Sequence, residues 1–250
     1  MAILELIDIS RNFGSIKALS GISLRVEAGE LRAVIGPNGA GKTTLFNLIT
    51  GLFRPSDGLI KYHGSVINGE RISQRIRNGI VRTFQITQIY PNLTVFDNVR
   101  IGVEAALGLT FRPVVSRAQR TSVEDRVWEL LMLMALEELA DRITGTLSHG
   151  DQRVVEVAMT MAYQPQLLLL DEPTAGMGDR ETEHMRELIR SLHRRGDMAI
   201  LFIEHDMDII FDVADSITVL DNGTLLADGI PDEIARNPKV QKAYLGDYNG

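Results

Sequence analysis

Apolar residues follow two different spacings along this chain. Short apolar runs bounded by glycine or polar residues are typical of strands, and early ones lie at residues 3–9, 23–27 and 31–35. The run LRAVI at 31–35 is followed by glycine, which predicts a buried strand. A helical segment is expected directly after it, from residue 42 to residue 49.

The same two spacings divide the rest of the chain. Residues 80–84 predict another strand, and from about residue 94 to residue 163 the spacing is mostly helical. Beyond residue 165, apolar runs such as QLLLLD and MAILFIE alternate again with helical segments. Alternating strands and helices predict an α/β fold with a parallel sheet and helices on its faces. The helical middle block is interpreted as an inserted subdomain.

Composition and charge narrow the classes of function. The 250 residues are 44% hydrophobic and 24% charged, as in an ordinary globular protein, and the formal net charge is −7. An acidic balance argues against nucleic acid as a partner, because sequence-independent binding needs a basic field. The chain has no cysteine, which excludes a disulfide framework and thiolate metal sites.

The first residues and the lengths of the apolar runs indicate where in the cell the protein is expected. The first residues, MAILELIDISRNFG, have acidic residues inside their apolar part and lack the basic start of a secretory signal. Runs such as LLLL are far too short to cross a bilayer. We therefore expect a soluble, cytoplasmic protein that reaches a membrane only through a partner.

A glycine-rich loop follows the strand expected at residues 31–35. Its sequence, GPNGAGKTT, matches GxxxxGK[ST] between a strand and a helix, which is the context that this motif requires. Backbone N–H groups of such a loop surround a phosphate, and the helix N-terminus adds positive charge. Lys42 can reach the β- and γ-phosphates, and the Thr43 hydroxyl can bind Mg²⁺. The expected ATP contacts are Gly36, Pro37, Asn38, Gly39, Ala40, Gly41, Lys42, Thr43 and Thr44.

Two acidic residues follow the apolar run LLLL. Asp171 and Glu172 lie at the carboxyl end of a buried strand, where parallel sheets bind ligands. We expect Asp171 to hold Mg²⁺ and Glu172 to orient and polarise an attacking water. Phosphoryl transfer needs this division, because one carboxylate is committed to the metal.

A second anion-binding motif lies a hundred residues after the first. The stretch LSHGDQ at residues 147–152 places a serine and a glycine at the start of an expected helix. Together with GPNGAGKTT, a glutamine after a strand (RTFQ), LLLLDEP and a histidine after a strand (FIEHD), it occurs in the order found in ATP-binding cassette ATPases. The chain resembles this family over essentially its whole length.

The resemblance implies an architecture. It is a P-loop NTPase core with a parallel sheet, an N-terminal antiparallel β part and an inserted helical subdomain. The core with its β part is expected at residues 1–88 and 165–250, and the helical subdomain with the signature motif at 89–164. Residues 230–250 are expected to form a short C-terminal helical tail.

The resemblance also implies roles for single residues. Glu172, His205 and Lys42 correspond to the catalytic groups, with His205 on the γ-phosphate. Thr43, Gln85 and Asp171 correspond to the Mg²⁺ contacts, and Phe13 to the aromatic residue that stacks on adenine. In the family two cassettes pack head to tail, so Ser148 and Gly150 are expected to contact the ATP held by the partner.

Two signature positions depart from the family pattern. His149 stands where glycine is usual, and Asp151 stands where glutamine is usual. An aspartate near a triphosphate is unfavourable unless it points away or serves the helix as N-cap or first-turn residue. Since Ser148 and Gly150 remain, we expect the signature to work. The segment AGMGD at residues 175–179 corresponds to the loop that crosses the dimer interface, in an uncommon form.

Within the family, the chain is most similar to ATP-binding subunits of branched-chain amino acid importers. The stretches that carry this similarity include VRTFQITQIYPNLTVFDNV, DEPTAGMGDRE and the ending NPKVQKAYLGD. It implies a second cassette, identical or paralogous, two transmembrane permease subunits and, indirectly, an external binding protein, with the chain peripheral at the cytoplasmic face of the membrane. Ile86, Ile89 and Tyr90 are candidates for contact with the permease, or for ordinary packing.

Several alternatives remain open. The AYLG ending also occurs in cassettes of urea importers and of lipopolysaccharide export. A non-transport cassette of DNA repair would carry a coiled coil between its halves, and residues 45–146 show no sustained heptads. Translation-associated cassette proteins carry two cassettes in one chain. A GTPase would need an NKxD motif, which is absent, and a purely regulatory ATP-binding module would not need Glu172 and His205.

Overall fold

The computed structural model describes residues 1–83, 89–109 and 116–245. The chain divides into two compact units. The first contains residues 1–80, 166–173 and 189–250, and the second contains residues 81–165 and 174–188.

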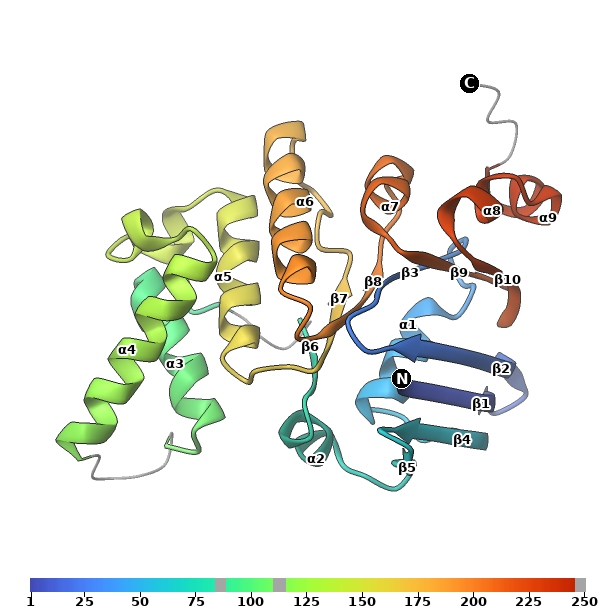
Figure 1. Ribbon diagram of the computed structural model, residues 1–250, viewed down its shortest axis with the longest axis horizontal. Coiled ribbons are helices and arrows are strands. Elements are labelled where there is room, and N and C mark those ends of the chain that lie inside the picture. Colours follow the sequence, from blue (N-terminus) through green and yellow to red (C-terminus); the bar gives the residue numbers. More distant parts are fainter. Residues whose placement is uncertain (84–88, 110–115, 246–250) are drawn as a thin grey trace. The chain divides into compact units, whose positions relative to one another are not determined.

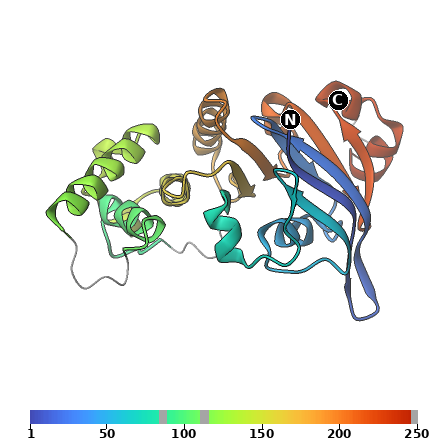
Figure 2. The same ribbon diagram turned by 60° about the horizontal axis from the view of Figure 1, so that its bottom comes forward.

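An antiparallel sheet opens the first unit (Figure 1). Its strands run in the order β2-β1-β4-β5, with bounds β1 Ala2–Phe13, β2 Ile16–Glu27, β4 Asp57–Tyr62 and β5 Ser65–Val66. Strands β1 and β2 form a long hairpin (Figure 2). The sequence predicted only their apolar parts, because the alternation is lost where register shifts interrupt the pairing.

A second sheet carries the nucleotide-binding motifs. Its order in the described residues is β10-β9-β3-β8-β7-β6, with bounds β3 Leu31–Ile35, β6 Ile80–Arg82, β7 Leu167–Asp171, β8 Ala199–Ile203, β9 Ser216–Asp221 and β10 Thr224–Gly229. Strand β3 pairs in parallel with β8 and β9, and β7 with β8, whereas β10 is antiparallel to β9. The predicted strand at 80–84 ends earlier, at Arg82.

Helices pack on these sheets. Within the first unit they are α1 Lys42–Thr50, α2 Ile72–Arg77, α7 Met207–Val213, α8 Pro231–Ala235 and α9 Pro238–Val240, followed by a π-helical turn Gln241–Leu245. Helix α1 is central, because its buried side chains join one apolar core with residues of β1, β2, β4, β7 and β8. The phosphate-loop helix is therefore held by both sheets.

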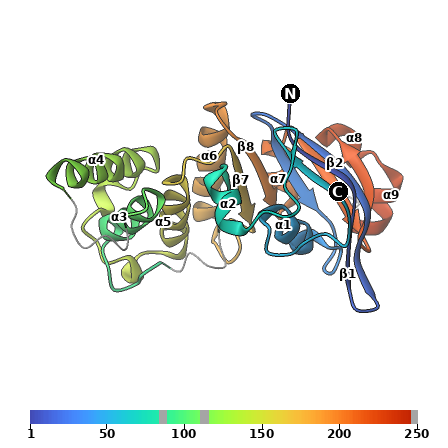
Figure 3. The same ribbon diagram turned by 90° about the horizontal axis from the view of Figure 1, so that it is seen from below.

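The second unit is helical. Its main helices are α3 Val95–Ala106, α4 Arg117–Leu133 and α5 His149–Met161, with 3₁₀ turns at Glu137–Leu139 and Thr144–Thr146 (Figure 3). Helix α6, Asp179–Arg194, begins in this unit and ends in the first. Buried Asn98 donates to the Thr144 hydroxyl and to the Tyr90 carbonyl. No helix in the described part of the chain is long and apolar enough to span a membrane.

These observations confirm the predicted fold class, with an N-terminal antiparallel sheet, a mainly parallel second sheet and a helical block. The helical unit also includes residues 81–88 and 174–188, outside the subdomain bounds of 89–164 that the sequence analysis expected. The helix expected at 42–49 extends to Thr50. The tail beyond residue 230 is helical as far as the structure describes it.

Candidate nucleotide-binding and hydrolysis site

The phosphate loop joins β3 to α1 and depends on glycine at two tight positions. A Cβ on Gly36 would lie 2.1 Å from the Leu220 carbonyl oxygen, and one on Gly41 would lie 2.5 Å from a methyl group of Leu19. Gly41 also has φ +101°, which disfavours other residues. The loop therefore turns closely against its own scaffold and leads into the N-terminus of α1, a position that favours an anion.

Lys42 lies in the first turn of α1 and points back over the loop. Its ammonium group donates to the carbonyl oxygens of Gly36, at 2.6 Å, and Pro37, at 3.1 Å. Burial lowers the pKa of Lys42, while the negative charges of Glu172 and Asp171 act in the opposite direction. The Lys42 side chain thus bonds to the backbone of its own loop, in the electrostatic field of the two acidic residues.

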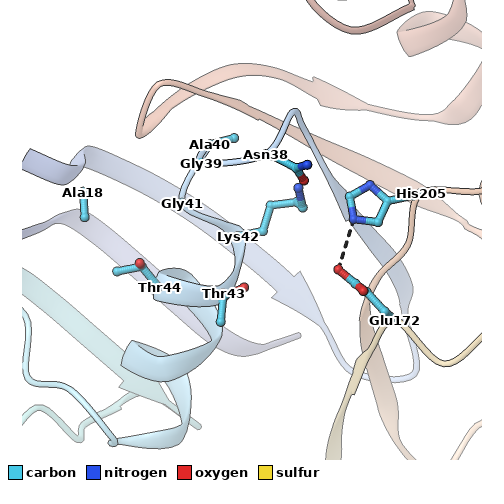
Figure 4. Close-up of a pocket in the computed structure, with 10 residues that line it drawn as sticks. All are labelled: Ala18, Asn38, Gly39, Ala40, Gly41, Lys42, Thr43, Thr44, Glu172 and His205. Carbon is cyan, nitrogen blue, oxygen red and sulfur yellow. Dashed lines mark hydrogen bonds and ion pairs between the residues drawn. The ribbon is translucent and has the colours of Figure 1, made fainter. Parts of the chain in front are cut away.

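Glu172 and His205 face each other across the neighbouring strands β7 and β8 (Figure 4). The His205 Nε2 atom lies 3.0 Å from the Glu172 Oε1 atom. Glu172 follows directly after β7 with φ +48°, a left-handed conformation that is uncommon for glutamate. Non-glycine residues in this region tend to be found at functional sites.

These groups converge on one pocket. It has a volume of about 210 Å³. Its lining consists of Ala18, Asn38, Gly39, Ala40, Gly41, Lys42, Thr43, Thr44, Glu172 and His205 (Figure 4). Sequence motifs far apart in the chain therefore meet at the carboxyl ends of β3, β7 and β8. Ala18 was not predicted, since nothing in its sequence context distinguishes it from a strand residue.

Phe13 is not among the residues that line this pocket. It ends β1, is 39% exposed, and contacts the ring of Phe53 edge to face at 5.2 Å. The Arg11 guanidinium lies 4.5 Å from the Phe13 ring centre. Neither Arg11 nor Phe53 was predicted, and the proposed stacking of Phe13 on adenine stays a prediction.

The signature motif forms the start of α5 in the second unit. Ser148 is the N-cap, and its side-chain oxygen accepts the Asp151 N–H at 3.1 Å. The Ser148 hydroxyl donates in turn to the Asp151 carboxylate. Asp151 is thus a first-turn residue, and the alternative that it is the N-cap is wrong. The Gly150 N–H donates to the Glu181 carboxylate at 3.1 Å, a contact that the sequence did not predict.

Of the other predicted residues, Gln85 and Ile86 lie outside the part of the chain that the structure describes. Ile89 is half-buried and Tyr90 is 48% exposed, with its backbone tied to the Asn98 side chain. The segment 175–179 leads into α6, and a Cβ on Gly176 would lie 3.7 Å from the His149 ring.

The residues fit ATP and Mg²⁺. The loop supplies backbone donors and a lysine for phosphates, and Thr43 and Asp171 offer oxygen atoms, which Mg²⁺ prefers. The described residues contain no cluster of three or more His, Cys, Asp or Glu side chains that could hold a metal ion by itself. A magnesium ion here would share its ligands with the triphosphate, as is usual for phosphoryl-transfer sites.

The chain is similar to known cassettes along nearly all of its length. It is 39% identical to the high-affinity branched-chain amino acid transport ATP-binding protein BraF of Pseudomonas aeruginosa, over 98% of both chains, and 40% identical to LivG of Salmonella typhimurium, over 94% of both. It is also 36% identical to the sulfate/thiosulfate import protein CysA of Pseudomonas syringae, over 98% of this chain and 73% of that one.

Structure and family comparisons agree with this. A nucleotide-free ATP-binding cassette from an ABC transporter has a TM-score of 0.86 and 30% identity, with 99% of this chain and all of that one covered. Residues 224–248 match the family described as branched-chain amino acid ATP-binding cassette transporter, and residues 19–175 match the family described as ABC transporter. The chain therefore belongs to the ABC transporter family, as one of its ATP-binding cassette ATPases.

Proposed function

We propose that this chain powers the import of branched-chain amino acids by binding and hydrolysing ATP. The observation that carries the substrate assignment is the C-terminal family match at residues 224–248, because overall identity alone also relates 98% of this chain to a sulfate importer's cassette. The near-complete coverage of BraF and LivG supports it. Cassettes of urea importers or of lipopolysaccharide export are the alternative.

The geometry around the pocket supports a mechanism for hydrolysis. The triphosphate lies along residues 36–44, with Lys42 on the β- and γ-phosphates. Glu172 and His205, held 3.0 Å apart, orient a water for in-line attack on the γ-phosphate. Lys42 stabilises the charge that develops in the transition state. Bound Mg²⁺, held by Thr43, Asp171 and Gln85, would neutralise phosphate charge.

The remaining parts of the proposal concern assembly. A second cassette, identical or paralogous, brings its Ser148 and Gly150 to the ATP of this chain, and Phe13 stacks on adenine. Two transmembrane permease subunits hold the pair at the cytoplasmic face of the membrane. Residues 89–164 act as the helical subdomain, and residues 1–88 and 165–250 as the core, with a helical tail from 230 to 250.

Hydrolysis is tested first by Glu172→Gln. We expect ATP binding to persist while turnover falls by roughly 10²–10⁴-fold, the usual contribution of a positioned acid–base group. Lys42→Ala should abolish binding or hydrolysis, and Glu183→Gln, on the exposed part of α6, is the matched control. Turnover in Glu172→Gln equal to that of the wild type would contradict the assignment of Glu172.

The substrate is tested in the transporter complex purified from its native membrane and placed in vesicles. Leucine, isoleucine or valine, presented with the external binding protein, should stimulate ATP hydrolysis and enter the vesicles. Stimulation by urea and not by leucine would overturn the substrate assignment and leave the ATPase assignment intact.

A further inference from the structure

Glu181 makes more contacts than its position in α6 requires. It is the third residue of that helix, and its Oε2 atom accepts the Gly178 N–H at 3.2 Å. A glutamate here commonly reaches back in this way to the start of its own helix. The Oε1 atom accepts in addition the Gly150 N–H, 31 positions away at the start of α5.

The Glu181 carboxylate interacts with both signature residues, Ser148 and Gly150. The Ser148 hydroxyl, whose one hydrogen can go to Asp151 or to Glu181, and the Gly150 and Gly178 N–H groups lower the pKa of Glu181, which keeps its side chain charged. A Cβ on Gly150 would lie 2.9 Å from the Cβ atom of Glu181, so the side chain packs directly against the glycine. Capping of α6 explains the contact with Gly178 and leaves the other two unexplained.

The donors that Glu181 uses are those assigned above to the partner's ATP. Ser148 and Gly150 lie at the N-terminus of α5, where an anion is favoured by the helix dipole and by unpaired N–H groups. A carboxylate and a phosphate oxygen cannot both accept the same N–H, and their negative charges repel each other. One anion must leave before the other binds.

We propose that Glu181 is a built-in competitor of the partner's γ-phosphate, which holds the Ser148–Gly150 pair until ATP displaces it. This inference rests on the proposed function. Its consequence is that Glu181 raises the ATP concentration needed for the two cassettes to close. A second consequence concerns the bridge that Glu181 forms between the start of α5 and Gly178. This bridge must break when the two cassettes close.

Two substitutions of Glu181 distinguish competition with the γ-phosphate from capping of α6. Glu181→Gln keeps a side chain that caps helices well and removes the charge. Glu181→Asp keeps the charge and shortens the side chain by one methylene group, so that it no longer spans from Gly178 to Gly150. Glu183→Gln is the control, since it removes one charge from the same helix at a residue that pairs with Arg186.

The first readout is the Gly150 amide in the isolated chain, measured by NMR without nucleotide. Loss of the bond to Glu181 should speed amide hydrogen exchange at Gly150 and move its resonance upfield in Glu181→Gln and Glu181→Asp. Glu183→Gln should match the wild type. A Gly150 amide unchanged by both Glu181 substitutions would overturn the proposal.

The second readout is the ATP concentration that gives half-maximal hydrolysis by the purified transporter complex. We expect it to fall by about 3- to 10-fold in both Glu181 variants, as for loss of one partly buried hydrogen bond. An unchanged or higher value would mean that Glu181 supports closure or only caps α6. Absence of hydrolysis in the wild-type complex would instead contradict the proposed function.

Discussion

At the scale of single residues, some features of the site can be recognised from a sequence motif. Others, such as an unusual backbone conformation, can be seen only in the structure. Gly36 and Gly41 are recognisable from GxxxxGK[ST], and the structure shows that a Cβ at either would collide with its surroundings. Glu172 is recognisable as an acidic residue after a strand. Its φ of +48° is not recognisable, because glutamate gives no sign of a left-handed conformation.

The conformation of Glu172 leads to a prediction about stability. Asparagine tolerates the left-handed region, whereas a β-branched residue does not. Glu172→Asn and Glu172→Val should both lose hydrolysis, and the valine variant should melt about 2–8 °C below the asparagine variant, as expected for about 1–2 kcal/mol of backbone strain in a chain of this size. Calorimetry checks this. Equal melting temperatures would mean that the backbone relaxes at residue 172.

At the scale of elements, α1 is fixed at both ends. Its C-terminal carbonyl groups are bonded by Arg75 of α2, which is fully buried and donates to Leu48, Ile49 and Ile67. Burial lowers the pKa of Arg75 to about 10, which still leaves it charged at neutral pH. A cation at the C-terminus of a helix also stabilises the helix dipole.

Arg75 is therefore expected to matter for folding. Arg75→Met should lower the free energy of unfolding by about 2–4 kcal/mol, because it leaves three buried carbonyl groups without this donor. Arg77→Met, at an exposed position of the same helix, should change it by less than about 0.5 kcal/mol. Denaturant titration measures both. A small effect at Arg75 would show that water replaces the guanidinium.

Helix α5 carries a partly buried acid, Glu156, whose ionisation makes stability depend on pH. Burial raises the pKa of Glu156, and its ion pair with Arg153 at 2.6 Å opposes this only in part. Because the folded-state pKa lies above the unfolded value, the folded chain binds the proton more tightly. The stability that this contributes is present below the ordinary pKa of about 4.5 and is lost as the pH rises through the folded-state value.

Glu156→Gln should remove that pH dependence. We expect the variant to melt at a higher temperature than the wild type at pH 7, and the difference to shrink as the pH falls towards 4.5. Thermal unfolding between pH 4.5 and pH 7 checks this. A wild type that melts higher at pH 7 would mean that the pair with Arg153 outweighs burial.

At the scale of the whole molecule, the sequence predicted the fold class because strand and helix spacings are local and the motifs carry their context. It did not predict the full length of the β1–β2 hairpin, whose outer part loses its apolar alternation. It also did not predict the contact of Glu181 with Gly150. That contact joins residues 31 positions apart. In the sequence, each of the two residues is already accounted for by its place at the start of a helix, so nothing points from one to the other.

Assembly of two cassettes gives the prediction at this scale. The chain has a mass of 27.7 kDa, and Glu172→Gln with Mg·ATP should show about twice that mass by light scattering, because binding without hydrolysis keeps the closed pair together. The wild type under hydrolysing conditions is the comparison. A variant that binds ATP and keeps the mass of one chain would identify the partner as a paralogous cassette or the permease.

The carbonyl of Ala18, in β2, lies close to two glycines from elsewhere in the chain. A Cβ on Gly41 would approach its oxygen to 2.9 Å and one on Gly223 to 2.6 Å. The N-terminal hairpin therefore packs directly against the phosphate loop. A shortened gene product that starts near residue 30 would retain every residue of GPNGAGKTT, LSHGDQ and LLLLDEP. A motif search would still identify it as a complete cassette. It would nevertheless lack the part of β2 around Ala18 that packs against the phosphate loop.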